Sequence, residues 1–157
     1  MTAFAQQIDK YLAGPALMRQ AVAGMSREQL LARPVAGKWS TLEVVAHLSD
    51  FEPVYTDRMK RIISHDRPLL LSADEQLFAT TLNYSGRDID EELTIVESTR
   101  KGMGRILKSL PADAAARVGV HSYRGLVTLE DMLNSAVGHV SHHLTFIHEK
   151  RKALGIG

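Results

Sequence analysis

Apolar residues recur at helical spacing in four long stretches of this chain, and this pattern constrains the fold more than any other feature of the sequence. The stretches are Phe4–Met25, Ser40–His65, Asp88–Leu110 and Thr128–Ala153. In each of them apolar side chains return every three or four residues, as they do on the buried stripe of a helix. The sequence therefore predicts an all-α fold built largely from these four helices.

Polar residues mark where the helices begin. Ser26 and Ser40 are each followed three residues later by Gln or Glu, which is the pattern of a capping box. Asp88 and Thr128 begin the third and fourth long helices with the same kind of polar start. The helix after Ser26 is short, because Pro34 follows closely.

Prolines and glycines mark the irregular parts of the chain. Gly14-Pro15 predicts an interruption of the first helix, and Pro53 predicts a kink in the second. The stretch 68–87 is the least regular and contains at most a short helix near 73–80. The stretch 112–127 carries glycines that predict an irregular or hairpin-like connection.

Composition bounds the class of protein. The chain has 157 residues, so residues 1–157 form one domain large enough to bury a core. Hydrophobic residues make up 45% and charged residues 24%, with a net charge of +1. Because the basic residues are scattered, we expect no nucleic acid and no membrane as partner. No long apolar run and no signal segment stands at the amino terminus, so we expect a cytoplasmic protein.

Cysteine is absent from the chain. This excludes disulfides, zinc sites made of thiolates, and a cysteine nucleophile. Any thiol chemistry would therefore need a sulfur that arrives with a substrate.

Three histidines occupy matching positions on two of the predicted helices. His139 and His143 are four residues apart, which places both rings on one face of the last helix, one turn apart. Both lie at the flank of the apolar face, whereas His142 lies on the other, more exposed side. His47 lies at the same flank of its own helix. Helices that pack side by side bring such flanks together, so the sequence predicts a three-histidine site.

Three imidazoles favour a particular class of metal. Neutral imidazole binds zinc, nickel, copper and iron and is a poor ligand for calcium or magnesium. Three protein ligands leave coordination positions open for water or a substrate, as in a reactive site. Each ligand is expected to donate its second ring nitrogen to an oxygen acceptor. Asp50 is one candidate acceptor for His47, and Glu43 is another.

Three motifs carry a resemblance to a known family. They are Lys38–Ser40, the run Glu43–Glu52, and the run His139–His143 followed by Ile147. In order and spacing they resemble the DinB-like, YfiT-related metalloprotein superfamily over nearly the whole chain. The resemblance implies a four-helix up-down bundle with a longer crossover between the second and third helices. It also implies that His47, His139 and His143 bind a divalent metal such as nickel or zinc.

The resemblance also bears on activity and assembly. Better-studied members transfer or isomerise small molecules with low-molecular-weight thiols such as bacillithiol or mycothiol, and many have no known activity. Members of the family are often homodimers. For this chain the resemblance therefore implies a small-molecule substrate, a thiol as one candidate, and a homodimer.

Simpler interpretations stand beside the metal site. The three histidines could be half-buried side chains that are satisfied by hydrogen bonds. His121 could line the mouth of a pocket or simply face solvent. Trp39 could pack as core or line the site.

Three other residues also allow a structural interpretation. Glu52 lies on an apolar side of its helix and could pair with an arginine such as Arg58 or act as a catalytic base. His65 is near a helix carboxyl end, where a positive charge is favourable. His148 is expected on the surface.

Two functional hypotheses follow from the residues and the resemblance. In the first, the protein is a metal-dependent enzyme that transfers a low-molecular-weight thiol or hydrolyses a substrate. In the second, it is a non-catalytic, metal-binding or stress-associated bundle, which predicts no open pocket beside the metal. A bundle without a metal is a third possibility, and it requires the three histidines to lie apart.

Overall fold

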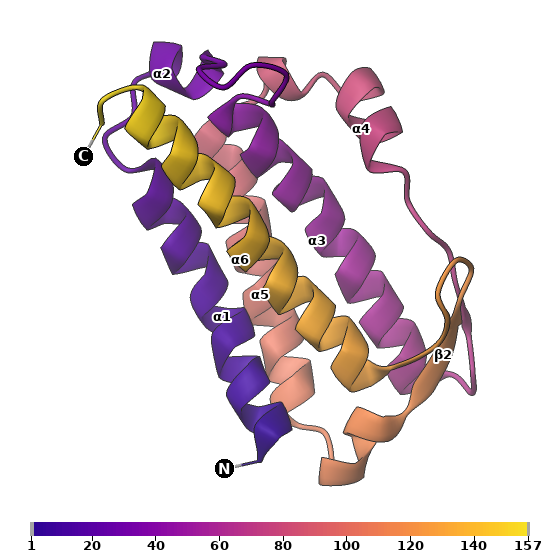
Figure 1. Cartoon of the computed structure of the whole chain (residues 1–157). Coiled ribbons are helices and arrows are strands. Elements are labelled where there is room, and N and C mark those ends of the chain that lie inside the picture. The colour runs from indigo at the N-terminus through magenta and orange to yellow at the C-terminus, as the bar shows by residue number, and fades with distance from the viewer. Residues whose placement is uncertain (1, 157) are drawn as a thin grey trace.

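Four long helices lie side by side in the computed structural model, which describes residues 2–156 (Figure 1). They are α1 (Ala3–Val22), α3 (Thr41–Ser64), α5 (Ile89–Lys108) and α6 (Leu129–Ala153). Helices α1 and α3 each pack against both α5 and α6, so α1 lies diagonally opposite α3. The predicted all-α four-helix bundle is confirmed.

A long crossover connects α3 to α5, as predicted. It contains β1 (Leu69–Leu70), α4 (Glu75–Thr81) and the 3-10 turn η1 (Tyr84–Gly86). The crossover runs back along the outside of the bundle, so α5 points in the same direction as α3 (Figure 1). The short helix α2 (Arg27–Leu31) lies in the connection between α1 and α3.

A small sheet closes the end of the bundle where α3 and α5 finish. After the 3-10 turn η2 (Ala112–Ala116), the strands β2 (Val118–His121) and β3 (Gly125–Thr128) form an antiparallel hairpin. The predicted hairpin-like connection is therefore present. Strand β1 of the crossover pairs in parallel with β2, which the sequence did not predict.

The polar start of α3 fixes the segment that carries His47. The Ser40 hydroxyl accepts a hydrogen bond from the Glu43 backbone N–H at 3.2 Å. The Glu43 carboxylate accepts one from the Ser40 backbone N–H at 2.7 Å. This capping box satisfies two backbone donors that the first helical turn leaves free, so α3 begins at a defined residue.

A buried ion pair joins three of the long helices. Arg100 of α5 donates from Nε and Nη2 to Glu52 of α3, at 2.9 and 2.7 Å, and Tyr11 of α1 donates its hydroxyl to the same carboxylate at 2.6 Å. Arg100 and Glu52 are 1% and 2% exposed. Arg58, the predicted partner of Glu52, donates instead to the Leu71 carbonyl. Residues six apart stand about 120° apart around a helix, which explains why the predicted pair is wrong.

Helix α1 continues through Gly14-Pro15, so the predicted interruption there is wrong. Pro15 has no backbone N–H, so the Tyr11 carbonyl, four residues earlier, lacks its usual helical hydrogen bond. Arg100 Nη1 donates to this carbonyl at 3.0 Å and replaces the missing bond. Gly14 makes the approach possible, because a β-carbon there would overlap the guanidinium of Arg100.

Within residues 2–156, none of the helices has the length and apolar character needed to cross a bilayer.

Candidate metal centre

The three predicted histidines meet between α3 and α6. His47 Nε2 lies 2.8 Å from His139 Nε2, and the ring centroids of His47 and His143 are 4.7 Å apart. One nitrogen from each ring can be chosen so that all three atoms lie within 4.8 Å of one another. The structure thus brings together the side chains that the sequence had predicted to converge.

Local structure explains the convergence. His139 and His143 are one helical turn apart on α6, with ring centroids 4.8 Å apart. Helix α3 packs along α6, so His47 faces both rings. His47 is 0% and His143 9% exposed, while His139 is half-buried.

The spacing of the His47 and His139 nitrogens is near that of two ligands on one divalent cation. Two imidazole nitrogens that each lie about 2.0–2.1 Å from one zinc ion are about 2.8–3.4 Å apart for bond angles of about 90–109°. The observed 2.8 Å between His47 and His139 is close to the lower limit of this range.

All three imidazoles are held in the neutral form. Burial lowers the pKa of His47 to about 4. Burial and the neighbouring histidines lower the pKa of His139 to about 2 and that of His143 to about 3. At neutral pH each ring therefore keeps an unprotonated nitrogen, which is the state that binds a metal.

The second ring nitrogens do not have the predicted partners. Asp50 is bound by the guanidinium of Arg87, at 2.7 and 2.9 Å, and Glu43 is bound by Arg33 and by the cap of α3. Both predicted acceptors are therefore wrong, because an arginine satisfies each carboxylate. Nδ1 of His47 and Nδ1 of His143 are buried without a hydrogen-bond partner among residues 2–156. Residues 2–156 therefore offer no acceptor to either of these two ring nitrogens.

An open cavity lies against the triad, which we define as His47, His139 and His143. This triad cavity has a volume of about 460 Å³, and its wall includes His139 and His143 together with Trp39, Phe146 and Lys150. The ring of Trp39 lies 5.2 Å from that of His47. Trp39 also packs against the apolar core, so both of its predicted roles are realised. A volume of this size suits a small molecule.

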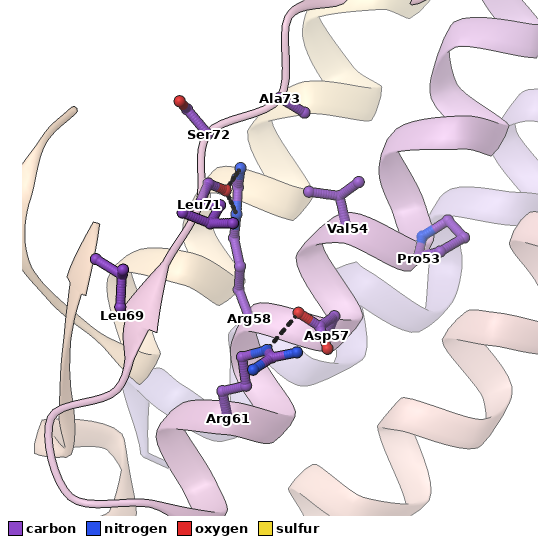
Figure 2. A pocket seen from close by; sticks show the side chains of 9 residues that line it. All are labelled: Pro53, Val54, Asp57, Arg58, Arg61, Leu69, Leu71, Ser72 and Ala73. Atoms are coloured by element: carbon purple, nitrogen blue, oxygen red, sulfur yellow. Dashed lines mark hydrogen bonds and ion pairs between the residues drawn. The ribbon is translucent and has the colours of Figure 1, made fainter. Parts of the chain in front are cut away.

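Size alone does not identify the site. A larger cavity of about 600 Å³ lies between α3 and the crossover (Figure 2). It is lined by Pro53, Val54, Leu69 and neighbouring residues and contains none of the triad. The cluster of titratable groups, and not the volume, distinguishes the triad cavity.

The remaining histidines are not part of the triad. His121 is 7% exposed and lines a separate cavity, not the triad cavity, so neither of its two predicted locations is found. His142 is exposed and lies at the wall of the triad cavity. His65, which follows the end of α3, and His148 are both exposed.

One residue at the triad cavity was not predicted from the sequence. Lys150 is 2% exposed and lines the triad cavity. Its ammonium donates to the Phe146 carbonyl at 3.2 Å, and burial lowers its pKa. Lys150 follows His143 by seven residues, which is two helical turns on the same face. That spacing was the signal in the sequence that could have identified it.

Comparisons with known proteins show a family match over most of the chain. The sequence profile of the DinB superfamily matches residues 11–147. Relatives that are provisionally named as metal-dependent hydrolases match most of the chain. YfiT of Bacillus subtilis is 26% identical over 142 residues (90% of this chain and 80% of that protein), and a protein of Bacillus licheniformis is 28% identical over 142 residues (90% and 81%). One from Oceanobacillus iheyensis is 26% identical over 133 residues (85% and 77%).

A solved structure gives the same fold. YfiT from Bacillus subtilis, whose structure is described as an unusual four-helix bundle, superposes with a TM-score of 0.92 at 24% identity. The match covers 100% of this chain and 91% of that one. The metal-dependent relatives and the three-histidine cluster together support a divalent metal in this protein.

Proposed function

Because this chain belongs to the DinB superfamily, we propose that it is a divalent-metal-dependent hydrolase of a small molecule, with the metal bound by His47, His139 and His143. The observation that carries the proposal is the triad itself: three neutral imidazoles with ligand nitrogens within 4.8 Å, beside a cavity of about 460 Å³. The provisional names of the relatives support the same reaction class. We further propose nickel or zinc as the metal, because both bind neutral imidazole well.

A divalent cation at this site would supply Lewis acidity and lower the pKa of a bound water molecule or thiol. The chain's own side chains supply the rest. Trp39 and Phe146 give the triad cavity apolar walls that hold an organic substrate. Lys150 offers an ammonium donor to substrate oxygens, and Glu75 places a carboxylate on the same wall, where it can accept a proton.

Thiol transfer is the second candidate. It is favoured by the absence of cysteine from the chain, since a thiol nucleophile would have to enter with a substrate. The same cavity would then hold a low-molecular-weight thiol. A non-catalytic role is the weaker proposal. It predicts no open pocket beside the metal, whereas the triad cavity lies against His139 and His143.

Metal analysis tests the site. Protein purified without a histidine tag is expected to carry about one divalent ion per chain, and His143→Ala is expected to lose at least about nine tenths of it, because two ligands bind far more weakly than three. His148→Ala is the matched control, since His148 is exposed on the same helix. Equal metal content in wild type and His143→Ala would overturn the proposed site.

Turnover tests the reaction. The metal-loaded protein is assayed with a panel of activated esters and amides, without and with a small thiol. Turnover above that of free metal without thiol supports hydrolysis, and turnover only with thiol supports transfer. If neither occurs but metal raises the melting temperature strongly, the non-catalytic role is supported instead.

A further inference from the structure

A further cavity, distinct from the two described above, is lined by two aromatic residues whose rings also pack against the triad. It has a volume of about 570 Å³ and lies between α3, the β2–β3 hairpin and the start of α4. Phe51 and Tyr55 line it, and their ring centroids lie 5.7 and 5.5 Å from that of His139. Glu75 and Gln76 line both cavities. The two cavities are therefore neighbours, and one small molecule can extend from one toward the other.

Arg58 brings a buried positive charge to this cavity. It is 7% exposed, and its Nε and Nη2 donate to the Leu71 carbonyl at 3.1 and 2.6 Å (Figure 2). Among residues 2–156 no carboxylate forms an ion pair with it, whereas Arg61, one turn later, pairs with Asp57. Burial, and the charge of Arg124 nearby, lower the pKa of Arg58. A buried cation without an anionic partner is costly, so it calls for an explanation.

His121 presents an N–H to the same cavity. Its Nδ1 accepts the backbone N–H groups of Tyr123 and Arg124, at 3.2 and 3.3 Å. An accepting Nδ1 in a neutral ring leaves the proton on Nε2. The pKa of His121 is lowered by burial, then by Arg58 and Arg124, which favours this neutral form. Within the described part of the chain Nε2 has no hydrogen-bond partner.

Two more donors complete the group. Arg124 lies on the hairpin and uses one guanidinium nitrogen to donate to Ser135 at 3.1 Å. The hydroxyl of Tyr55 has no hydrogen bond to any of residues 2–156. Two acidic residues also line the wall. The Asp74 carboxylate caps α4 by accepting two backbone N–H groups, and Glu75 is exposed. The cavity therefore combines donors from Arg58, Arg124, His121 and Tyr55, and of its two carboxylates one caps α4 and the other is exposed. We call it the arginine cavity, after Arg58 and Arg124.

We propose that the arginine cavity binds an anionic oxygen group, a carboxylate or a phosphate, at one end of the substrate. The guanidinium groups of Arg58 and Arg124 and the Nε2–H of His121 are the donors. Guanidinium forks match the geometry of both anions and form the stronger class of hydrogen bonds. The identification of the anion as part of the substrate rests on the proposed function, since the triad would act on the other end of the same molecule.

Anion titration tests the proposal on the full chain. Inorganic phosphate and succinate are added to metal-free and metal-loaded protein, with uncharged succinamide as the neutral control. Binding is followed by calorimetry and by the side-chain NMR signals of the histidines, with His121 assigned from the signal lost in His121→Asn. We expect saturable binding of at least one anion, with a shift of the His121 signal, in both forms of the protein. The anion that binds more tightly identifies the group.

Variants locate the binding. Arg58→Met is expected to weaken binding by about tenfold or more, because a charged hydrogen bond is lost. Arg124→Met, on an exposed hairpin, tests the same cavity without disturbing the contact to Leu71. The matched control is Arg61→Met, which removes an equal charge from the same helix outside the arginine cavity.

The outcomes separate this proposal from the proposed function. An anion that shifts only His139 or His143, equal weakening in Arg61→Met, or the absence of saturable binding would each overturn the anion site. None of these results bears on the metal content of wild type and His143→Ala. Conversely, if His143→Ala keeps its metal while anions bind normally, the metal site fails and the anion site stands.

Discussion

A single arginine side chain joins all four long helices, because Arg100 of α5 contacts each of the other three. Arg100 pairs with Glu52 of α3, donates to the Tyr11 carbonyl of α1, and donates at 2.9 Å to the Ala136 carbonyl of α6. The contact with the Tyr11 carbonyl depends on Pro15, because proline has no backbone N–H to occupy that carbonyl. A buried charge with all of these contacts is stable only while its partners remain.

Replacing Arg100 is expected to destabilise the fold strongly. Arg100→Leu leaves Glu52 buried without its counter-charge, so the free energy of unfolding should fall by about 3–5 kcal/mol. Urea denaturation of the metal-free protein measures this. Arg105→Leu, an exposed position of the same helix, is the control and should change it by less than about 0.5 kcal/mol. A similar loss in both variants would contradict the structural importance of the buried pair.

At the scale of the element, helix starts were readable from the sequence and long-range partners were not. The polar residues Ser40, Asp88 and Thr128 each cap a long helix, as predicted, because capping is local chemistry. The triad was also predictable, since helical spacing fixes which residues share a flank. The partner of Glu52 and the acceptors for His47 were predicted wrongly, because they depend on where α5, the crossover and the α2–α3 connection place their arginines.

Removing the cap of α3 is expected to cost stability. Ser40→Ala should lower the free energy of unfolding by about 1 kcal/mol, because the Glu43 N–H loses its acceptor. Ser26→Ala is the matched control, since Ser26 has the same capping box on the five-residue α2, whose melting exposes less of the core. Chemical denaturation compares the two. A loss in Ser40→Ala no larger than in Ser26→Ala would contradict the importance of this cap.

At the scale of the whole molecule, the crossover determines how the bundle is threaded. The segment 65–88 is long enough to let α5 run parallel to α3. The resemblance to the DinB-like family had implied this longer crossover. Strand β1 could not be predicted, because two residues become a strand only by pairing with β2, some fifty positions later in the chain. The pairing of two copies and the cytoplasmic location are not tested by the fold and stay predictions.

The metal-free molecule is expected to lose stability in acid. The pKa values of His47, His139 and His143 in the folded protein are about 4, 2 and 3, below the 6.5 of an exposed histidine. Below pH 6.5 the unfolded chain therefore binds protons that the folded protein does not, and the free energy of unfolding falls as the pH falls. Urea midpoints with a chelator present, between about pH 7.5 and 4.5, measure the slope.

The variant His143→Phe should show a shallower dependence on pH, since one titrating group has been removed. A midpoint that is constant or rises toward acid would contradict the buried, neutral state of the triad.

The position of Trp39 has an optical consequence. It is the one tryptophan in the chain, and its indole lies 5.2 Å from a triad imidazole at the wall of the triad cavity. Ultraviolet emission excited at the red edge of protein absorption therefore comes from a single ring at the site. The fluorescence intensity and wavelength of Trp39 therefore report on ions and small molecules that enter the site, without a label and without any change to the sequence.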